Sequence, residues 1–420
     1  MNTFQTIVLG IFGFFIIAGL AVIAINKSRD SGEGKVMLTL WGSAPSAVID
    51  ELSKELFLSK ALKVSYREFP AEGLDRELIE AIAAGRGPDM VLLPLELLLR
   101  YRDKLFPISY ETYSERQFKD SFIQAGDAFL FPEGILALPF SVDPLIMYWN
   151  RNLFDEGGVA TAPRYWDEFL LLPNRLTRRD AKGNFSRSAV ALGEFKNING
   201  AKEIILALLL QSGSSGGSMQ GGFPTLLRSD SGAARAVDFY TEFSNPSKVV
   251  YSWNRGQPSS RQAFLASRLA IYFGFGSELP ELRRGNPNLN FDAAHFPRPR
   301  DAQVSFTYGK MTGVAVLRSA QNIGGALQAT FLLASPAASS LLSGRTGLPP
   351  VQRSLLGKAP ADAFGSVLYD SALRSRGFLD PNPTESSPVF QELIESITGG
   401  RAKASSALVG AEARLRGLVR

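Results

Sequence analysis

The stretch Gly85–Pro94, which reads Gly-Arg-Gly-Pro-Asp-Met-Val-Leu-Leu-Pro, decides the fold class. Its glycines and first proline end a helix and start an apolar strand, and the strand opens into a loop at Leu93–Glu96. In open α/β sheets, ligands sit outside the carboxyl ends of the strands. We therefore expect this loop, and the loop Trp41–Pro45 after an earlier strand, to contact a ligand.

Strand and helix patterns alternate on both sides of this stretch, which predicts a parallel sheet covered by helices on both faces. The expected strands are 36–41, 62–67, 89–93, 145–148, 189–192, 269–273, a segment near 291, and 312–317. The expected helices are 46–56, 74–84, 165–175, 201–211 and 233–243, with further helices filling much of the C-terminus. Gly213–Gly222 is rich in glycine and serine and has no phosphate-binding pattern, so it is interpreted as a flexible connector.

Composition excludes several function classes. The 420 residues include no cysteine, so disulfides, thiolate metal sites, cysteine nucleophiles and a lipidated N-terminal cysteine are absent. The single histidine, His295, is interpreted as structural, and neither a metal site nor a cofactor is expected. A net charge of +5 is spread over interleaved acidic and basic residues, which does not indicate a nucleic-acid partner.

An apolar run from Ile7 to Ile25 is long enough to cross a membrane, since 19 residues of helix span roughly 28 Å. A cleaved signal peptide is the alternative, but no basic residue precedes the run and no small-x-small pair directly follows it. We expect a retained single-pass anchor, followed by a polar tether that ends at residue 35. Basic residues after the run favour a cytoplasmic C-terminal domain by positive-inside counting, although large domains translocate largely regardless of that bias.

A second informative stretch is Leu138–Asn150, which reads Leu-Pro-Phe-Ser-Val-Asp-Pro-Leu-Ile-Met-Tyr-Trp-Asn. Asp143 stands here among apolar neighbours, where the first strand–helix series gives way to the next. This position suits a hinge carboxylate that accepts hydrogen bonds from a ligand. A turn aspartate before Pro144, important for stability only, is the alternative.

Taken in order, these motifs resemble the family 1 extracellular solute-binding proteins of bacterial ABC importers, of which maltose-binding protein is the best-known member. The matching segments are Gly85–Asp89, Leu138–Asp143, Tyr148–Phe154, Thr161–Phe169, Gln211–Gly213, Ala263–Phe275 and Thr346–Val351. Each motif is weak alone, but their order and spacing over about residues 36 to 400 make the resemblance specific. Phe378 stands where many relatives carry tryptophan, and the first loop is short, which puts maltodextrin specificity in doubt.

The resemblance implies a two-lobed periplasmic-binding-protein-like α/β fold of type II, with one solute between the lobes and no catalysis. The implied crossings between lobes lie near Leu138–Asp143, Ala270–Gly276 and Leu333–Gly347. The implied lobes are 36–140 plus 277–337 (N-lobe) and 141–276 plus 338–420 (C-lobe), preceded by the anchor and tether, 1–35. The implied role is extracytoplasmic capture of a sugar or sugar-like solute for ABC permease subunits. We therefore expect the C-terminal domain outside the cytoplasm, although positive-inside counting favours the cytoplasm.

The resemblance and the strand-end rule together predict a set of ligand-facing residues that suit a polyol. Aromatic faces stack on sugar C–H groups, while carboxylates, amides and lysine supply directional hydrogen bonds. The predicted residues are Trp41, Gly42, Ser43, Asp89, Glu96, Asp143, Asn197, Asn199, Phe275, Tyr308 and Lys310.

Two other functions stay open on the sequence alone. The same binding fold could serve as a ligand-sensing adaptor for a membrane signalling protein. A membrane-anchored hydrolase would need two facing carboxylates, and Glu96, Asp143 and Glu194 are the available acids, although nothing in their settings marks an acid/base pair.

Overall fold

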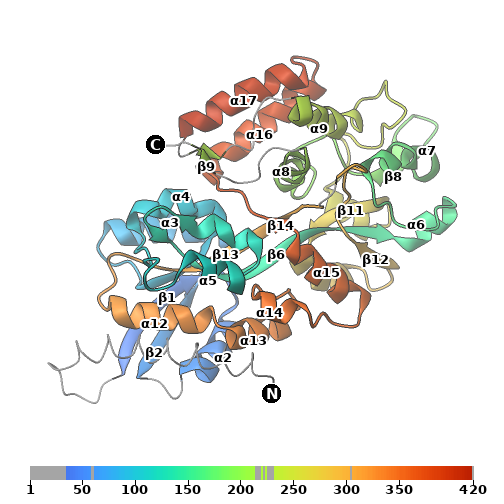
Figure 1. Cartoon of the computed structure of the whole chain (residues 1–420). Coiled ribbons are helices and arrows are strands. Elements are labelled where there is room, and N and C mark those ends of the chain that lie inside the picture. The colour runs from blue at the N-terminus through green and yellow to red at the C-terminus, as the bar shows by residue number, and fades with distance from the viewer. Residues whose placement is uncertain are drawn as a thin grey trace.

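A computed structural model describes residues 35–57, 61–212, 219–220, 223–224, 231–302 and 305–418 of the chain. The described residues form two lobes that share one ten-stranded sheet (Figure 1). Its strands are β1 (Val36–Gly42), β2 (Leu62–Glu68), β3 (Met90–Pro94), β6 (Leu138–Asn150), β7 (Arg178–Arg179), β8 (Phe185–Val190), β11 (Leu269–Phe275), β12 (Phe291–Ala294), β13 (Thr307–Val316) and β14 (Ser375–Arg376). The strand order is β2-β1-β3-β13-β6-β11-β8-β7, with β12 also beside β6 and β14 beside β13.

Helices cover this sheet in both lobes. In the order of the chain they are α2 (Ser46–Phe57), α3 (Ala71–Ala83), α4 (Leu98–Tyr101), α5 (Glu115–Ser121), α6 (Arg151–Glu156), α7 (Leu172–Leu176), α8 (Ala201–Gln211), α9 (Ser231–Glu242), α10 (Ser260–Leu265), α11 (Leu279–Gly285), α12 (Ile323–Leu333), α13 (Pro336–Thr346), α14 (Arg353–Leu356), α15 (Ala363–Leu373), α16 (Pro383–Thr398) and α17 (Ala404–Leu418). Two short hairpins, β4 (Leu130–Phe131) with β5 (Gly134–Ile135) and β9 (Met219–Gln220) with β10 (Phe223–Pro224), lie outside the main sheet.

The first lobe begins with the strand–helix–strand pattern that the sequence predicts. β1 is parallel to both β2 and β3, with Val36 opposite Leu62 and Leu40 opposite Met90. Leu38 and Leu40 are buried while Met37 and Thr39 are exposed, because successive side chains of a strand point to opposite faces. The expected helix at 46–56 is confirmed as α2.

β6 is the element that joins the two lobes. Its residues 138–144 pair with β13, whereas residues 145–149 pair with β11, so one strand of 13 residues belongs to both lobes (Figure 1). The sequence predicted only its second part, because Pro139 and Pro144 interrupt the usual strand pattern. Pro139 lies opposite Gly313, where the register of β13 shifts by a bulge.

The sheet is mixed, so the expectation of a parallel sheet is correct for only part of each lobe. β1, β2 and β3 are parallel, and so are β8 and β11. β13 is antiparallel to both β3 and β6, and β6 is antiparallel to β11 and β12. Antiparallel pairing follows from the path of the chain, which leaves the first lobe through β6 and returns through β13.

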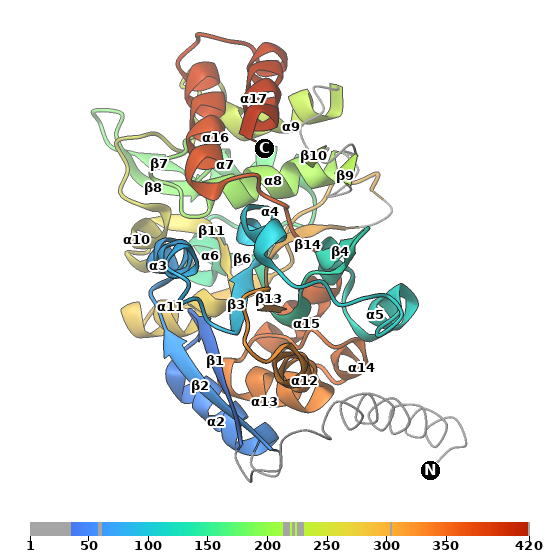
Figure 2. The same ribbon diagram turned by 90° about the vertical axis from the view of Figure 1, so that its left-hand side faces the viewer.

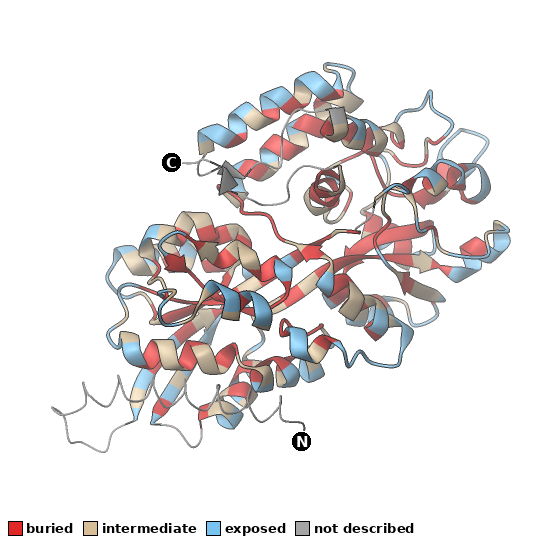
Figure 3. Cartoon of the chain, viewed as in Figure 1, coloured by how far each residue is buried: buried red, intermediate tan, exposed pale blue. Residues whose placement is uncertain are grey.

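The second lobe packs around α8, which matches the predicted helix 201–211. All residues from Ile204 to Leu210 are buried, because α9 and α16 cover α8 on the sides away from the sheet (Figures 2 and 3). Trp166 lies in the same core and donates from Nε1 to Oε1 of Gln211 at 2.7 Å. The expected helix 165–175 is instead a 3-10 turn at Trp166–Leu170 followed by α7, which begins at Leu172 and carries Pro173 in its first turn.

The expected boundary at residue 277 is wrong for the segment that follows β11. β12 pairs with Asn150 and its neighbours in β6, and Leu282, Leu289 and Phe296 lie in the core of the second lobe. The chain therefore stays in the second lobe after Gly276 and crosses back only through β13. Strand pairing over this distance leaves no local signal in the sequence.

The third crossing also lies later than expected. α12 and α13, at the predicted crossing Leu333–Gly347, pack in the core of the first lobe against α2. The chain leaves this lobe after α14, and α15 then packs against β6 and β12. The lobe limits elsewhere along the chain stay predictions.

The predicted anchor at 7–25 and nearly all of the tether lie outside the described residues, as does most of the connector 213–222. Within the described ranges, no single helix has the length and apolar character to cross a membrane, and only the bent pair α12 and α13 meets that test jointly, by length and composition.

Candidate functional site

The carboxyl ends of β1 and β3 lie at one edge of the first lobe, as the strand-end rule predicts. Glu96 follows β3 within a 3-10 turn, Leu95–Leu97, and is partly buried. Trp41 is the penultimate residue of β1 and packs on Phe69 at 4.8 Å between ring centroids, with the guanidinium of Arg67 over both rings. Gly42 is buried against Leu92, and a Cβ atom added at position 42 would lie only 2.8 Å from the Cβ of Leu92. Ser43 is exposed.

The hinge region brings four of the predicted residues together on β6, β11 and β13. Lys310 lies opposite Asp143 in the β6–β13 register, and its Nζ stands 3.9 Å from the ring centroid of Phe275. Phe275 also meets Tyr308 edge to face at 6.4 Å. Neighbouring strands therefore hold a lysine, a carboxylate and two aromatic rings at the junction of the lobes.

Asp143 is partly buried, and burial raises the pKa of its carboxyl to about 6. Its Oδ1 accepts a hydrogen bond from the backbone N–H of Ser277 at 3.0 Å, and this bond and the charge of Lys310 act against the rise. The carboxylate thus ties the first part of β6 to the turn after β11, a long-range contact and not the local turn contact of the turn-aspartate alternative.

A cavity of about 320 Å³ lies between the lobes. The first lobe contributes Glu96, and the other lining residues come from the loop before α8, from the first turn of α8 and from the start of α16. These are Phe195, Ile198, Gly200, Ala201, Lys202, Glu203, Pro383 and Ser387. Because both lobes line this space, its shape depends on how they are placed relative to each other.

Charged groups surround this cavity. Lys202 forms an ion pair with Asp380, which is only 1% exposed, and Ser386 accepts from the same Nζ at 2.9 Å. Burial raises the pKa of the Glu96 carboxyl, and Glu203 and Asp380 raise it further while Lys310 and Lys202 act in the opposite sense. Burial likewise raises the pKa of Tyr308, with the carboxylates of Glu96, Glu203 and Asp380 as further causes.

Three of the predicted ligand-facing residues are engaged elsewhere in the fold. Asp89 stands at the opposite end of β3, where its carboxylate accepts from the backbone N–H and hydroxyl of Thr39, both at 2.8 Å, and from the N–H of Gln321. Asn197 donates to the carbonyls of Asn254 and Gln257 and accepts from Trp253.

Asn199 accepts from the hydroxyl of Ser260 and the N–H of Arg261, both at 3.1 Å. Together with Asn197, it fixes the loop before α8 against the start of α10.

A sequence profile of the bacterial extracellular solute-binding proteins matches residues 42–338, well over half of the chain. The chain belongs to this family. It is therefore a binding protein and not an enzyme, and the hydrolase alternative falls away.

The curated relatives match a smaller part of this chain than the family profile does. A protein of Brucella abortus (strain 2308), named only as a binding protein, is 24% identical over 158 residues. This match spans 36% of the chain and 38% of the relative's length. A Brucella suis relative has the same identity and coverage.

Solved structures of solute-binding proteins share the fold over nearly the whole chain. A cyclic α-maltosyl-1,6-maltose binding protein from Arthrobacter globiformis superposes with a TM-score of 0.75 at 16% identity, covering 92% of this chain and 99% of that one. A cyclo/maltodextrin-binding protein in complex with maltotetraose gives 0.73 at 16% identity, covering 94% and 99%. The sugar-binding protein MalE from Xanthomonas citri gives 0.72 at 19% identity, covering 91% and 97%. At these identities the likeness establishes the fold alone.

For this family member, sequence reasoning found Glu96 but missed most of the cavity. Lys202 and Glu203 directly follow the loop that carries the two predicted asparagines, so the prediction was only a few residues off. Asp380 follows Phe378–Leu379, and its partner Lys202 is 178 residues away in the sequence. No local pattern could have joined them.

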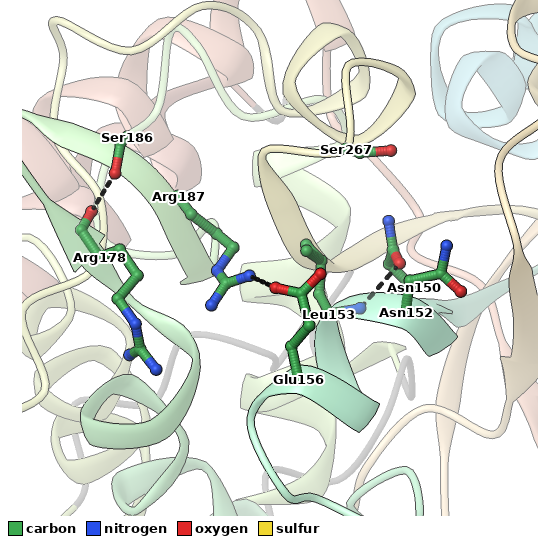
Figure 4. A pocket seen from close by; sticks show the side chains of 8 residues that line it. All are labelled: Asn150, Asn152, Leu153, Glu156, Arg178, Ser186, Arg187 and Ser267. Atoms are coloured by element: carbon green, nitrogen blue, oxygen red, sulfur yellow. Dashed lines mark hydrogen bonds and ion pairs between the residues drawn. The ribbon is translucent and has the colours of Figure 1, made fainter.

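A larger cavity of about 450 Å³ lies away from the hinge, at the outer end of β6 (Figure 4). Its lining comes only from the second lobe and includes Asn150, whose Oδ1 caps α6 through the N–H of Leu153, and Arg187, which pairs with Glu156. Ser267, with φ +53°, borders it as the left-handed residue that ends α10. The smaller cavity remains the better candidate, because only there do both lobes contribute.

Proposed function

We propose that this protein is a membrane-anchored, extracytoplasmic solute-binding protein that captures a sugar or sugar-like solute between its lobes and delivers it to an ABC importer. The observation that carries the proposal is the cavity lined by Glu96 from one lobe and by the start of α8 and α16 from the other. The solved proteins of the same fold whose names state a sugar ligand support the solute class.

The lining of the cavity suits a sugar. Phe195, Ile198 and Pro383 offer apolar surface for the C–H face of a pyranose ring. Glu96 and Glu203 can accept hydrogen bonds from hydroxyl groups, and the hydroxyl of Ser387 can donate or accept. A few polar groups within an apolar frame are typical of small-molecule sites.

The strands that join the lobes support ligand-driven closure. β6 and β13 are continuous through the junction, so a change of twist along these two strands would move one lobe relative to the other. Small-angle scattering should show a smaller radius of gyration at saturating solute, and an unchanged radius would contradict closure.

Anchoring through residues 7–25 and transfer to permease subunits are further parts of the proposal. The apolar run supports the first and family membership supports the second. Native protein that begins after residue 25 would exclude the anchor. Copurification of permease subunits from the native membrane would favour transport, whereas copurification of a signalling protein alone would favour the ligand-sensing adaptor.

A thermal-shift screen tests the solute class. The full chain is purified in a detergent without a sugar headgroup, because a maltoside headgroup could itself occupy the cavity. Malto-oligosaccharides, other neutral saccharides, amino acids and polyamines are then compared. A raised melting temperature with saccharides alone is the expected result, and stabilisation by amino acids alone would overturn it.

A further inference from the structure

Two carboxylates line the cavity without a charge partner. The carboxylates of Glu96 and Glu203 make no hydrogen bond or ion pair with any other residue in the described part of the chain. Glu96 belongs to the first lobe, whereas Glu203 stands in the first turn of α8 in the second lobe. The unmatched negative charges therefore come from both sides of the cavity.

The carboxylates near the cavity outnumber the lysines. Lys202 lines the same cavity, but its Nζ is held by Asp380 and Ser386 and lies 5.7 Å from the ring centroid of Phe390. Lys310 stands over Phe275 and opposite Asp143, and its charge opposes the rise in the pKa of Glu96. With Asp143 and Asp380, four carboxylates thus stand against two lysines, in a chain whose net charge is +5.

A tyrosine hydroxyl near these carboxylates is open to a ligand. The side chain of Tyr308 is only 4% exposed, and Glu96 and Glu203 are its electrostatic neighbours. Its hydroxyl has no hydrogen-bond partner among the residues described and is not sealed from solvent. A bound solute could therefore replace water as its hydrogen-bond partner.

Closure of the lobes would increase the repulsion between the two carboxylates. When the lobes approach, Glu96 and Glu203 come closer together and lose water, and both effects disfavour two ionised carboxylates. A neutral sugar can donate hydroxyl hydrogen bonds to them but leaves the two charges in place. A protonated amine on the ligand would neutralise them and donate stronger, charge-assisted hydrogen bonds.

We propose that the solute is a sugar that carries a protonated amine, with the ammonium group held between Glu96 and Glu203. This inference rests on the proposed sugar-binding function and narrows it to amino sugars. Phe195, Ile198 and Pro383 would contact the apolar face of the ring, and the ammonium group would allow the lobes to close.

Titration calorimetry on the full chain tests this with matched ligands. Glucosamine tetrasaccharide is compared with its N-acetylated form, which keeps the ring and loses the charge, and with maltotetraose, at a pH where the amine is protonated. We expect at least tenfold tighter binding of the amino sugar than of either neutral tetrasaccharide.

Glu96→Gln and Glu203→Gln should each weaken amino-sugar binding by about tenfold, with little effect on neutral sugars. Glu55→Gln, the same change on an exposed position of α2, is the control and should leave affinity unchanged. If one variant fails to fold, the other and the wild-type ligand comparison still decide.

The outcomes separate this inference from the broader proposal. Neutral tetrasaccharides that bind as tightly as the amino sugar would overturn the inference and keep the sugar-binding function. Binding of spermidine without any saccharide, or of no saccharide at all, would overturn both.

Discussion

The two charged groups around the cavity differ in how far the fold satisfies them. Lys202 and Asp380 form a buried pair that Ser386 completes, joining α8 to the start of α16. Glu96 and Glu203 border the same space without partners in the described structure. The first group is expected to determine stability and the second to determine binding. Substitutions in the first should therefore lower the free energy of unfolding, whereas substitutions in the second should weaken solute binding.

The largest effect should come from breaking the buried pair. Asp380→Ala leaves Lys202 with one hydroxyl as its partner, and loss of one member of a buried pair costs about 3–5 kcal/mol of the free energy of unfolding. Chemical denaturation with wild type as reference measures this loss. The double variant Lys202→Met/Asp380→Leu should recover most of the stability, and a single variant as stable as wild type would show that the pair is not structural.

The next effect concerns pH and Asp143. The folded chain holds a proton on this carboxyl more tightly than the unfolded chain, since burial raises its pKa from the ordinary 3.8 of an aspartate to about 6. Stability from this group is therefore lost as pH rises from about 4 to about 6, by at most about 3 kcal/mol. Asp143→Asn should remove this pH dependence, because an amide does not titrate in this range. The structure should be kept, because the amide oxygen can still accept the hydrogen bond from the backbone N–H of Ser277.

Denaturation midpoints of wild type and Asp143→Asn between pH 4 and 7 measure the difference. Parallel pH dependence of the two proteins would mean that Asp143 titrates normally. Tighter binding of solute by wild type than by this variant, at equal stability, would instead restore Asp143 as a ligand residue.

A smaller loss is expected at Asp89, which resembles the buried pair in being satisfied by the fold. Asp89→Ala removes the hydrogen bonds to Thr39 and Gln321 and should cost about 2 kcal/mol of the free energy of unfolding. Solute affinity should not change. A loss of affinity at unchanged melting temperature would place Asp89 in the binding site after all.

The smallest effect on stability is expected at Glu96. Its carboxylate is partly buried without a partner, so Glu96→Gln should leave the free energy of unfolding unchanged or raise it by up to about 1 kcal/mol. A thermal melt without solute measures this. Marked destabilisation would reveal a structural role and weaken the contrast between the two groups.

Local patterns allowed good prediction of single elements. The apolar spacing of Ala201–Gln211 predicted α8 to the residue, and the strand-end rule placed Glu96 at the cavity. Pairing between distant segments could not be predicted: β12 returns to β6, and Asp89 is bound to Thr39, 50 residues away. An aspartate that binds a ligand and one that binds a neighbouring strand have the same local sequence, so only the fold separates them.

The position of β13 in the sheet has a consequence for how the protein forms. β13 lies between β3 and β6, so the sheet of the first lobe remains split until residues 307–316 have been synthesised, more than 200 residues after β3. Pairing across such a sequence separation folds slowly, because the closure entropy of the loop comes before any gain from the contacts. The growing chain therefore spends most of its synthesis without a finished first lobe, and a ribosome-released fragment ending before Thr307 should be readily cleaved by proteases in that region.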